Sequence, residues 1–151
     1  MRINIIESKL LTDHHLLAEY NELNMVAQSF KRSILFKKGN DIIPKEYSLN
    51  NGHVKFFYNK GKYLYKRFYE LKNELKNRGF NVKMDFKNYW LYRMEYFNDW
   101  KPSKNDYKVI FDRIKYKVEL KPDFYRYKRN KIKVDEYLKF LKLNLFENEL
   151  K

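Results

Sequence analysis

Apolar residues recur at α-helical spacing in four segments of the chain, and this periodicity constrains the fold more than any other feature. Positions three and four apart share one face of a helix, so each segment has a side suited to burial. Helices are expected over residues 12–33, about 54–78, about 104–120 and 133–149. Their apolar faces are Leu16, Tyr20, Leu23, Ala27 and Phe30; Leu64, Phe68, Leu71 and Leu75; Tyr107, Ile110, Phe111, Ile114 and Val118; and Val134, Leu138, Leu141 and Leu145.

Residues that begin or end helices stand at the borders of these segments. Thr12 and Ser103 can accept hydrogen bonds from the first turns of the first and third helices. Asp13 follows Thr12, where the helix dipole favours a carboxylate. Gly79 can end the second helix, because glycine adopts the left-handed conformation at little cost, and an interruption of that helix is expected near Gly61.

The remaining segments lack clean periodicity. Residues 40–52 are expected to be a loop, residues 80–102 an irregular aromatic connection, and Asn4–Ile6 is the only weak strand candidate. We therefore predict an all-α fold. It would be a compact single domain of three main helices with long irregular connections and a short C-terminal amphipathic helix.

Composition excludes several classes of protein. The chain has 151 residues, the size of one domain, and no cysteine, so disulfide frameworks and cysteine-ligated zinc are excluded. Its three histidines are too few for most all-histidine metal sites. Neither a transmembrane run nor the apolar core of a signal peptide is found, so we expect an intracellular protein, cytoplasmic or associated with a nucleoid or virion.

The charge of the chain indicates a polyanionic partner. Lys and Arg number 33 and Asp and Glu 19, which gives a formal net charge of +14. Such a charge on a small domain attracts polyanions, of which nucleic acid comes first. The alternative for part of the excess is codon drift in an AT-rich genome, which enriches Lys and Asn without functional meaning.

The amino terminus is a candidate nucleophile. Arg2 is large enough to block removal of the initiator residue, so the mature chain is expected to begin with Met1. An α-amine has a pKa of ~7.7–8.0 against ~10.4 for lysine, and a larger fraction is therefore neutral and nucleophilic at pH 7. The alternative is an ordinary frayed terminus.

A polar stripe on the first helix contains His15, Glu19 and Glu22, which are spaced i, i+4 and i+7. A carboxylate here can stabilise a cationic sugar or imine and move protons. The alternative is a solvated helix face, because glutamate is a common exposed residue.

A basic aromatic segment covers residues 121–129, and Arg113 and Lys117 precede it at i, i+4 spacing. Cations bind phosphates, and aromatic rings stack on unpaired bases. The segment therefore favours contact with nucleic acid. The alternative is a soluble basic surface whose aromatic residues lie in the core.

Three blocks of sequence stand out in order, namely Met1–Asn4 with Leu11–Leu23, Pro44–Lys60, and Lys121–Tyr127. Together they resemble the pyrimidine-dimer DNA glycosylase family of T-even bacteriophages and algal viruses. The resemblance extends from Met1 to about Arg129. It predicts a glycosylase-like domain over residues 1–129 and a lysine-rich amphipathic C-terminal extension over residues 130–151, beyond the end of the phage enzyme.

This resemblance implies a mechanism. Members remove the 5′ base of a cyclobutane pyrimidine dimer and then cut the strand at the abasic site, using the amine of the mature first residue as nucleophile. By the match, Met1 supplies the amine and Glu22 the catalytic carboxylate. The matching or conservatively replaced DNA-contact positions are Arg2, His15, Arg113, Lys117, Tyr125 and Arg126.

The resemblance further implies a monomeric enzyme that acts on double-stranded DNA containing pyrimidine dimers or abasic sites, with no metal or organic cofactor and no membrane. The phage enzyme has arginines at two positions where this chain has Asn21 and Met25. Asn21 lies beside Glu22 and counts among the expected DNA-contact residues. These departures keep a second hypothesis open, a non-catalytic DNA-binding protein on the same fold. A third hypothesis gives residues 130–151 a partner-protein or membrane-surface role.

Overall fold

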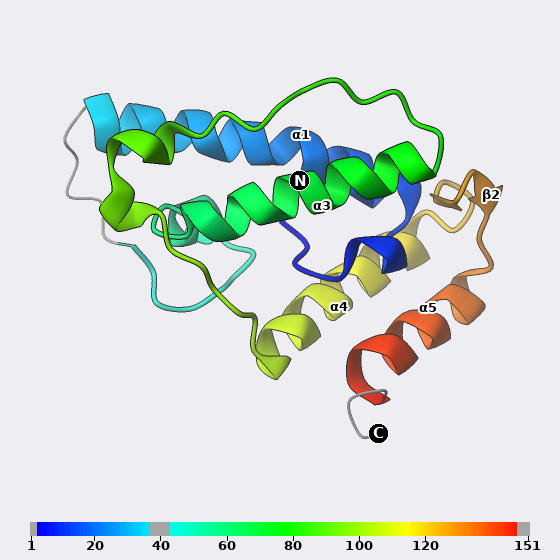
Figure 1. Cartoon of the computed structure of the whole chain (residues 1–151). Coiled ribbons are helices and arrows are strands. Elements are labelled where there is room, and N and C mark those ends of the chain that lie inside the picture. The colour runs from blue at the N-terminus through cyan, green and yellow to red at the C-terminus, as the bar shows by residue number, and fades with distance from the viewer. Residues whose placement is uncertain (1–2, 37–42, 148–151) are drawn as a thin grey trace.

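The computed structural model describes residues 3–36 and 43–147, and within these ranges the fold is all-α, as predicted. Five α-helices carry the architecture of the described part (Figure 1). Helix α1 (Asp13–Phe30) lies alongside α3 (Gly61–Asn77), and α4 (Lys104–Leu120) lies alongside α5 (Val134–Lys142). A short 3₁₀ turn, η1 (Ser8–Leu10), precedes α1.

Helix α1 begins at the predicted cap. The Thr12 hydroxyl oxygen accepts a hydrogen bond from the backbone N–H of His15 at 3.2 Å. The predicted apolar face of α1 is buried, from Leu16 to Phe30. The prediction ended this helix at Ser33, whereas the chain continues beyond α1 as a π-helical stretch, Lys31–Phe36.

The second predicted helix is interrupted, as the sequence indicated. It consists of a short α2 (His53–Phe56) and the longer α3. Gly61 lies against the Trp90 ring so closely that an added Cβ would stand 2.4 Å from it. Gly79 follows the end of α3 with a φ of +87°, the left-handed conformation expected there.

The connection between α3 and α4 is irregular apart from the 3₁₀ turns η3 (Tyr89–Tyr92) and η4 (Met94–Tyr96). Trp90 anchors it in the core. The Trp90 ring stacks on Phe30 with 4.3 Å between ring centroids, and its indole N–H donates to the Tyr58 carbonyl at 2.8 Å. The predicted irregular, core-packed character of this segment is confirmed.

Helices α4 and α5 support one another. Ser103 caps α4 in a reciprocal capping box with Asp106, as its position predicted. The last predicted helix, 133–149, is observed as α5 followed by a π-helical stretch, Leu143–Glu147. Its predicted apolar residues Leu138, Leu141 and Leu145 are buried, so α5 and its continuation belong to the same core.

The predicted strand Asn4–Ile6 is wrong. Ile5 has a φ of +53°, and the Ile6 N–H donates to the Asn4 carbonyl at 2.6 Å. This γ-turn reverses the chain, which a strand cannot do. The strands in the described ranges are instead β1 (Arg126–Tyr127) and β2 (Asn130–Lys131), an antiparallel pair that the pattern did not indicate. None of the helices in the described ranges combines the length and the hydropathy that a membrane crossing requires.

Candidate functional site

Side chains from distant segments hold the first described residues in place. The Ile3 N–H donates to Nε2 of His53 at 2.9 Å, and the Tyr47 hydroxyl donates to the Ile3 carbonyl at 2.8 Å. Nδ1 of His53 lies 2.8 Å from the Ser48 carbonyl. Since Nε2 accepts a hydrogen bond, Nδ1 carries the proton in this arrangement. Both backbone groups of Ile3 are therefore fixed.

A buried ion pair fixes the next residue. Glu19 is fully buried, and its carboxylate accepts from Arg67 at 2.6 and 3.0 Å and from the Asn4 N–H at 3.0 Å. Burial alone would lower the pKa of Arg67, but the charge and hydrogen bonds of Glu19 raise it above its ordinary value. Glu19, one of the three residues of the predicted polar stripe, therefore has a structural role. The alternative that it lies on a solvated helix face is excluded.

Beside this anchored segment lies a cavity of about 430 Å³, called here the α1–α4 cavity. It is formed by the N-terminal segment, α1, α4 and the residues before β1. Four predicted site residues line it together, namely His15, Arg113, Lys117 and Tyr125. Its other lining residues are Asn4, His14, Ala18, Ile114, Leu120, Lys121 and Phe124.

His15 is held neutral in the wall of this cavity. Its ring stacks on Tyr125 with 4.8 Å between centroids and an angle of 18°, and its Nδ1 lies 2.8 Å from the Thr12 hydroxyl. Burial, followed by the charges of His14 and Lys117, lowers the pKa of His15 to about 3. The ring can therefore offer a hydrogen bond but carries no charge at neutral pH.

The cavity is positive and partly aromatic. Arg113, Lys117 and Lys121 line it, and none of the described residues in its lining carries a carboxylate. Burial and the charge of Lys121 lower the pKa of His14. Burial raises the pKa of the Tyr125 hydroxyl, and Arg113 opposes that rise. Cations bind a phosphate, and aromatic rings beside them can stack on the adjoining sugar or base.

The other predicted residues lie outside the cavity lining. Glu22 is buried on α1, one turn after Ala18, and so lies on the side of the helix that bears the cavity wall. Asn21 and Arg126 are exposed, and the Arg126 guanidinium donates to the Asp123 and Tyr125 carbonyls. Met1 and Arg2 lie outside the described residues.

Several members of the site were not singled out from the sequence. Lys121 and Phe124 belonged to the basic aromatic segment, whose composition was the signal that pointed to them. Asn4, Tyr47 and His53 carried no local signal, because they act through contacts between segments far apart in the chain. In the described ranges, no group of three or more His, Asp or Glu residues is arranged to hold a metal ion.

Comparison with protein families adds one finding. The sequence model of the family described as pyrimidine dimer DNA glycosylase matches residues 1–88, which is more than half of the 151-residue chain. The match contains the anchored N-terminal segment, α1, α2 and α3, and it ends before α4.

Proposed function

This chain belongs to the pyrimidine dimer DNA glycosylase family, and we propose that it is bifunctional, releasing a damaged base and then cutting the strand as an AP lyase. Membership makes it a DNA repair glycosylase whose substrate is DNA with pyrimidine dimers. The observation that carries the finer proposal is the α1–α4 cavity, where cations and aromatic rings meet the fixed N-terminal segment.

The proposed nucleophile is the α-amine of Met1 in a mature chain that begins there. Met1 precedes Asn4 by three residues, and Asn4 lines the cavity. Three residues span at most about 11 Å, and this short reach supports a role for the amine at the cavity. The amine is nucleophilic only as the free base, and its intrinsic pKa makes that form accessible near neutral pH.

The proposed chemistry proceeds in two steps. The amine attacks C1′, the bond from C1′ to the base breaks with its electron pair leaving on the base, and loss of the amine proton and opening of the sugar give an imine. A proton is then removed from C2′, and the 3′ phosphate leaves by β-elimination, which cuts the strand. Hydrolysis of the remaining imine releases the protein.

Glu22 is the proposed acid–base group. A carboxylate stabilises the positive charge that develops on the sugar and on the iminium, and it can accept and return the protons of both steps. The burial of Glu22 on α1, one turn from the cavity wall, supports this role. A positioned acid–base group contributes about 10²–10⁴-fold to the rate.

The proposed DNA contacts are made by a surface around the cavity. Arg113, Lys117 and Arg126 bind phosphates, and His15 and Tyr125 contact the sugar or an unstacked base. Arg2 and Asn21 complete the proposed contacts on the N-terminal side. A nucleotide is expected to flip out, because C1′ is inaccessible in a stacked duplex.

We further propose that a monomer carries the activity.

The proposed glycosylase domain comprises residues 1–129, and residues 130–151 form the extension that supports it. The Tyr137 hydroxyl donates to the Leu10 carbonyl at 2.8 Å, which joins the extension to the segment before α1. This packing favours a supporting role for the extension over a free partner-binding tail.

Borohydride trapping on a duplex with one abasic site tests the proposal. A protein with a verified free Met1 should be trapped, and peptide mapping should place the adduct on Met1. The same protein with an acetylated amine should bind the duplex but give no adduct. Adducts confined to lysine side chains would contradict the nucleophile.

Glu22→Gln tests the carboxylate separately. This variant should bind the abasic duplex normally and lose about 10²–10⁴-fold in incision rate. Glu136→Gln, at an exposed position on α5, is the matched control and should incise normally. If both wild type and Glu22→Gln bind but neither traps nor incises, the non-catalytic DNA-binding alternative replaces the lyase proposal.

A further inference from the structure

A strained turn joins β1 to β2. Tyr127 pairs with Asn130, and the two residues between them, Lys128 and Arg129, have φ values of +49° and +69°. Turns of this kind usually contain glycine or asparagine, since other residues lose stability in the left-handed conformation. The turn therefore needs support from outside the hairpin.

Asp13 supplies that support from the first turn of α1. One carboxylate oxygen accepts from the Lys128 N–H at 3.0 Å, and the other accepts from the Arg129 N–H at 2.7 Å. Consecutive N–H groups in such a turn form a small concave site for an anion. Here the anion is a side chain of the same protein, and Asp13 is 5% exposed.

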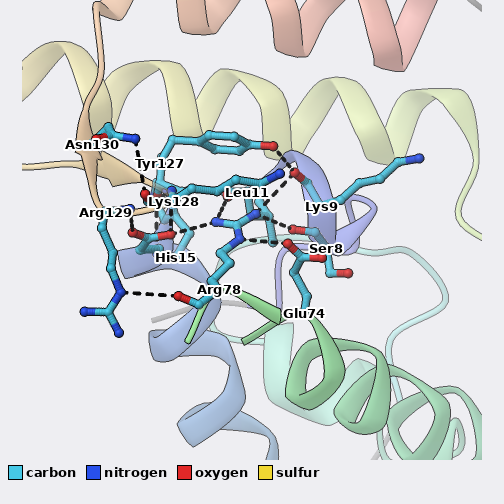
Figure 2. A network of polar contacts seen from close by, with 12 residues as sticks. Ser8, Lys9, Leu11, His15, Glu74, Arg78, Tyr127, Lys128, Arg129 and Asn130 are labelled. Atoms are coloured by element: carbon cyan, nitrogen blue, oxygen red, sulfur yellow. Dashed lines mark hydrogen bonds and ion pairs between the residues drawn. The ribbon is translucent and has the colours of Figure 1, made fainter. Parts of the chain in front are cut away.

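Arg78 holds Asp13 in place. Its guanidinium donates to Asp13 at 2.8 Å, to the Leu11 carbonyl at 2.8 Å and to Glu74 at 2.8 Å, with longer bonds to the carbonyls of Ser8 and Lys9. Figure 2 shows Arg78 central in this network, with Tyr127 above its guanidinium. The guanidinium carbon is 4.7 Å from the Tyr127 ring centroid, and the Tyr127 hydroxyl donates to the Lys9 carbonyl.

The residues next to this network form the wall of the α1–α4 cavity. His14 and His15 follow Asp13 directly, while Phe124 and Tyr125 precede β1. His15 stacks on Tyr125, and the His14 ring meets the Phe124 ring edge-on with 4.7 Å between centroids. Neither Asp13 nor Arg78 lines the cavity itself.

We infer that Asp13, held by Arg78, is a positioning residue that fixes the hairpin turn and thereby places Phe124 and Tyr125 against His14 and His15. This inference deepens the proposed function, on which its consequence for DNA rests. The Asp13–Arg78 clamp also joins the family-matched part of the chain to the part beyond it, since residues 124–131 lie outside the match to residues 1–88.

Asp13→Asn is the decisive variant, and the reporter is the imidazole of His15 followed by NMR titration in the DNA-free protein. Removing a nearby carboxylate would, by charge alone, lower the pKa of a histidine further. If Tyr125 no longer covers the His15 ring, water reaches the imidazole and raises its pKa. The groups that face His15 from its own helix and from α4, His14 and Lys117, are unchanged. A fall in the pKa of His15 would therefore report only the lost charge of Asp13, whereas a rise would report that Tyr125 has lost its position.

In the folded wild-type protein His15 should not titrate between about pH 5 and 7, whereas in Asp13→Asn it should titrate in that range. Affinity for an abasic duplex should fall about tenfold. Asp135→Asn removes a carboxylate from the first turn of α5 and should change neither quantity. A folded Asp13→Asn protein whose His15 pKa stays near its wild-type value or falls would overturn the inference.

If Asp13→Asn does not fold, Tyr127→Phe replaces it, because this variant removes only the hydroxyl bond to the Lys9 carbonyl. Its His15 pKa should rise by a smaller amount, and an unchanged pKa would count against the clamp. The two proposals fail separately. A wild-type protein that binds no DNA would refute the proposed function, while the His15 titration would still decide the role of Asp13.

Discussion

The charge state of His15 is the clearest property that the fold imposes on a single residue. Its pKa is lowered to about 3, chiefly by burial, against an ordinary value of 6.5. The unfolded chain therefore binds a proton at this position below about pH 6.5, and the folded protein does not until about pH 3. The stability that the neutral His15 contributes to the folded protein is therefore complete above pH 6.5, and it is lost progressively as the pH falls toward 3.

His15→Gln should remove this pH dependence. Between about pH 6 and 5, the free energy of unfolding of the wild type should fall by up to about 1.4 kcal/mol per pH unit more than that of the variant. Urea denaturation at each pH measures the two slopes. Parallel pH profiles would contradict the neutral, buried state of His15.

Part of the candidate site could be predicted from residue types and from the resemblance. The rest depends on contacts between residues far apart in the chain. His15, Arg113, Lys117 and Tyr125 were predicted and meet in one cavity. Glu19 looked similar to Glu22 in the sequence, yet its partner Arg67 lies 48 residues away, so helical spacing held no sign of its structural role. The predicted roles of Met1 and Glu22 remain predictions.

Secondary-structure elements with local causes were predictable, and those with distant causes were not. Thr12 and Ser103 begin α1 and α4, and Gly79 follows the end of α3, each as expected from its own helix. The β1–β2 hairpin has no glycine in its turn and depends on Asp13, which is 115 residues away from Lys128. No pattern within residues 126–131 indicates such a turn.

Helix α5 and the π-helical stretch after it offer a matched test of the packing of the C-terminal extension. Leu141 is fully buried, whereas Leu143 is 46% exposed. Leu141→Ala should cost about 2–5 kcal/mol through lost burial and the cavity left behind, and Leu143→Ala less than about 1 kcal/mol. Chemical denaturation of both variants checks this prediction. Equal effects would mean that the extension does not share the core of the domain.

At the scale of the whole molecule, a net charge of +14 makes binding to DNA strongly dependent on salt. Each phosphate that a cation neutralises releases condensed counterions, so the logarithm of affinity falls linearly with the logarithm of salt concentration. Overall charge alone does not locate the contact. The cations of the α1–α4 cavity mark the proposed contact, because they gather beside aromatic rings and the described lining residues include no carboxylate.

Lys117→Gln should therefore weaken binding to all duplexes about equally and reduce the salt slope by roughly 1. Lys142→Gln, at the end of α5, removes the same charge away from the cavity and should leave the slope nearly unchanged. Affinity measured at several salt concentrations gives both slopes. Equal changes in the two variants would place the contact elsewhere on the basic surface.

The clamp between Asp13 and the hairpin turn also has a consequence for how the molecule is made. It closes a contact across 115 residues, and such long-range contacts form late because the entropy of loop closure must first be overcome. During synthesis, α1 leaves the ribosome long before Lys128 exists. A nascent chain therefore forms α1 before residues 124–131 can complete the wall of the α1–α4 cavity, and the proposed DNA contacts at that wall follow only after those residues have been synthesised.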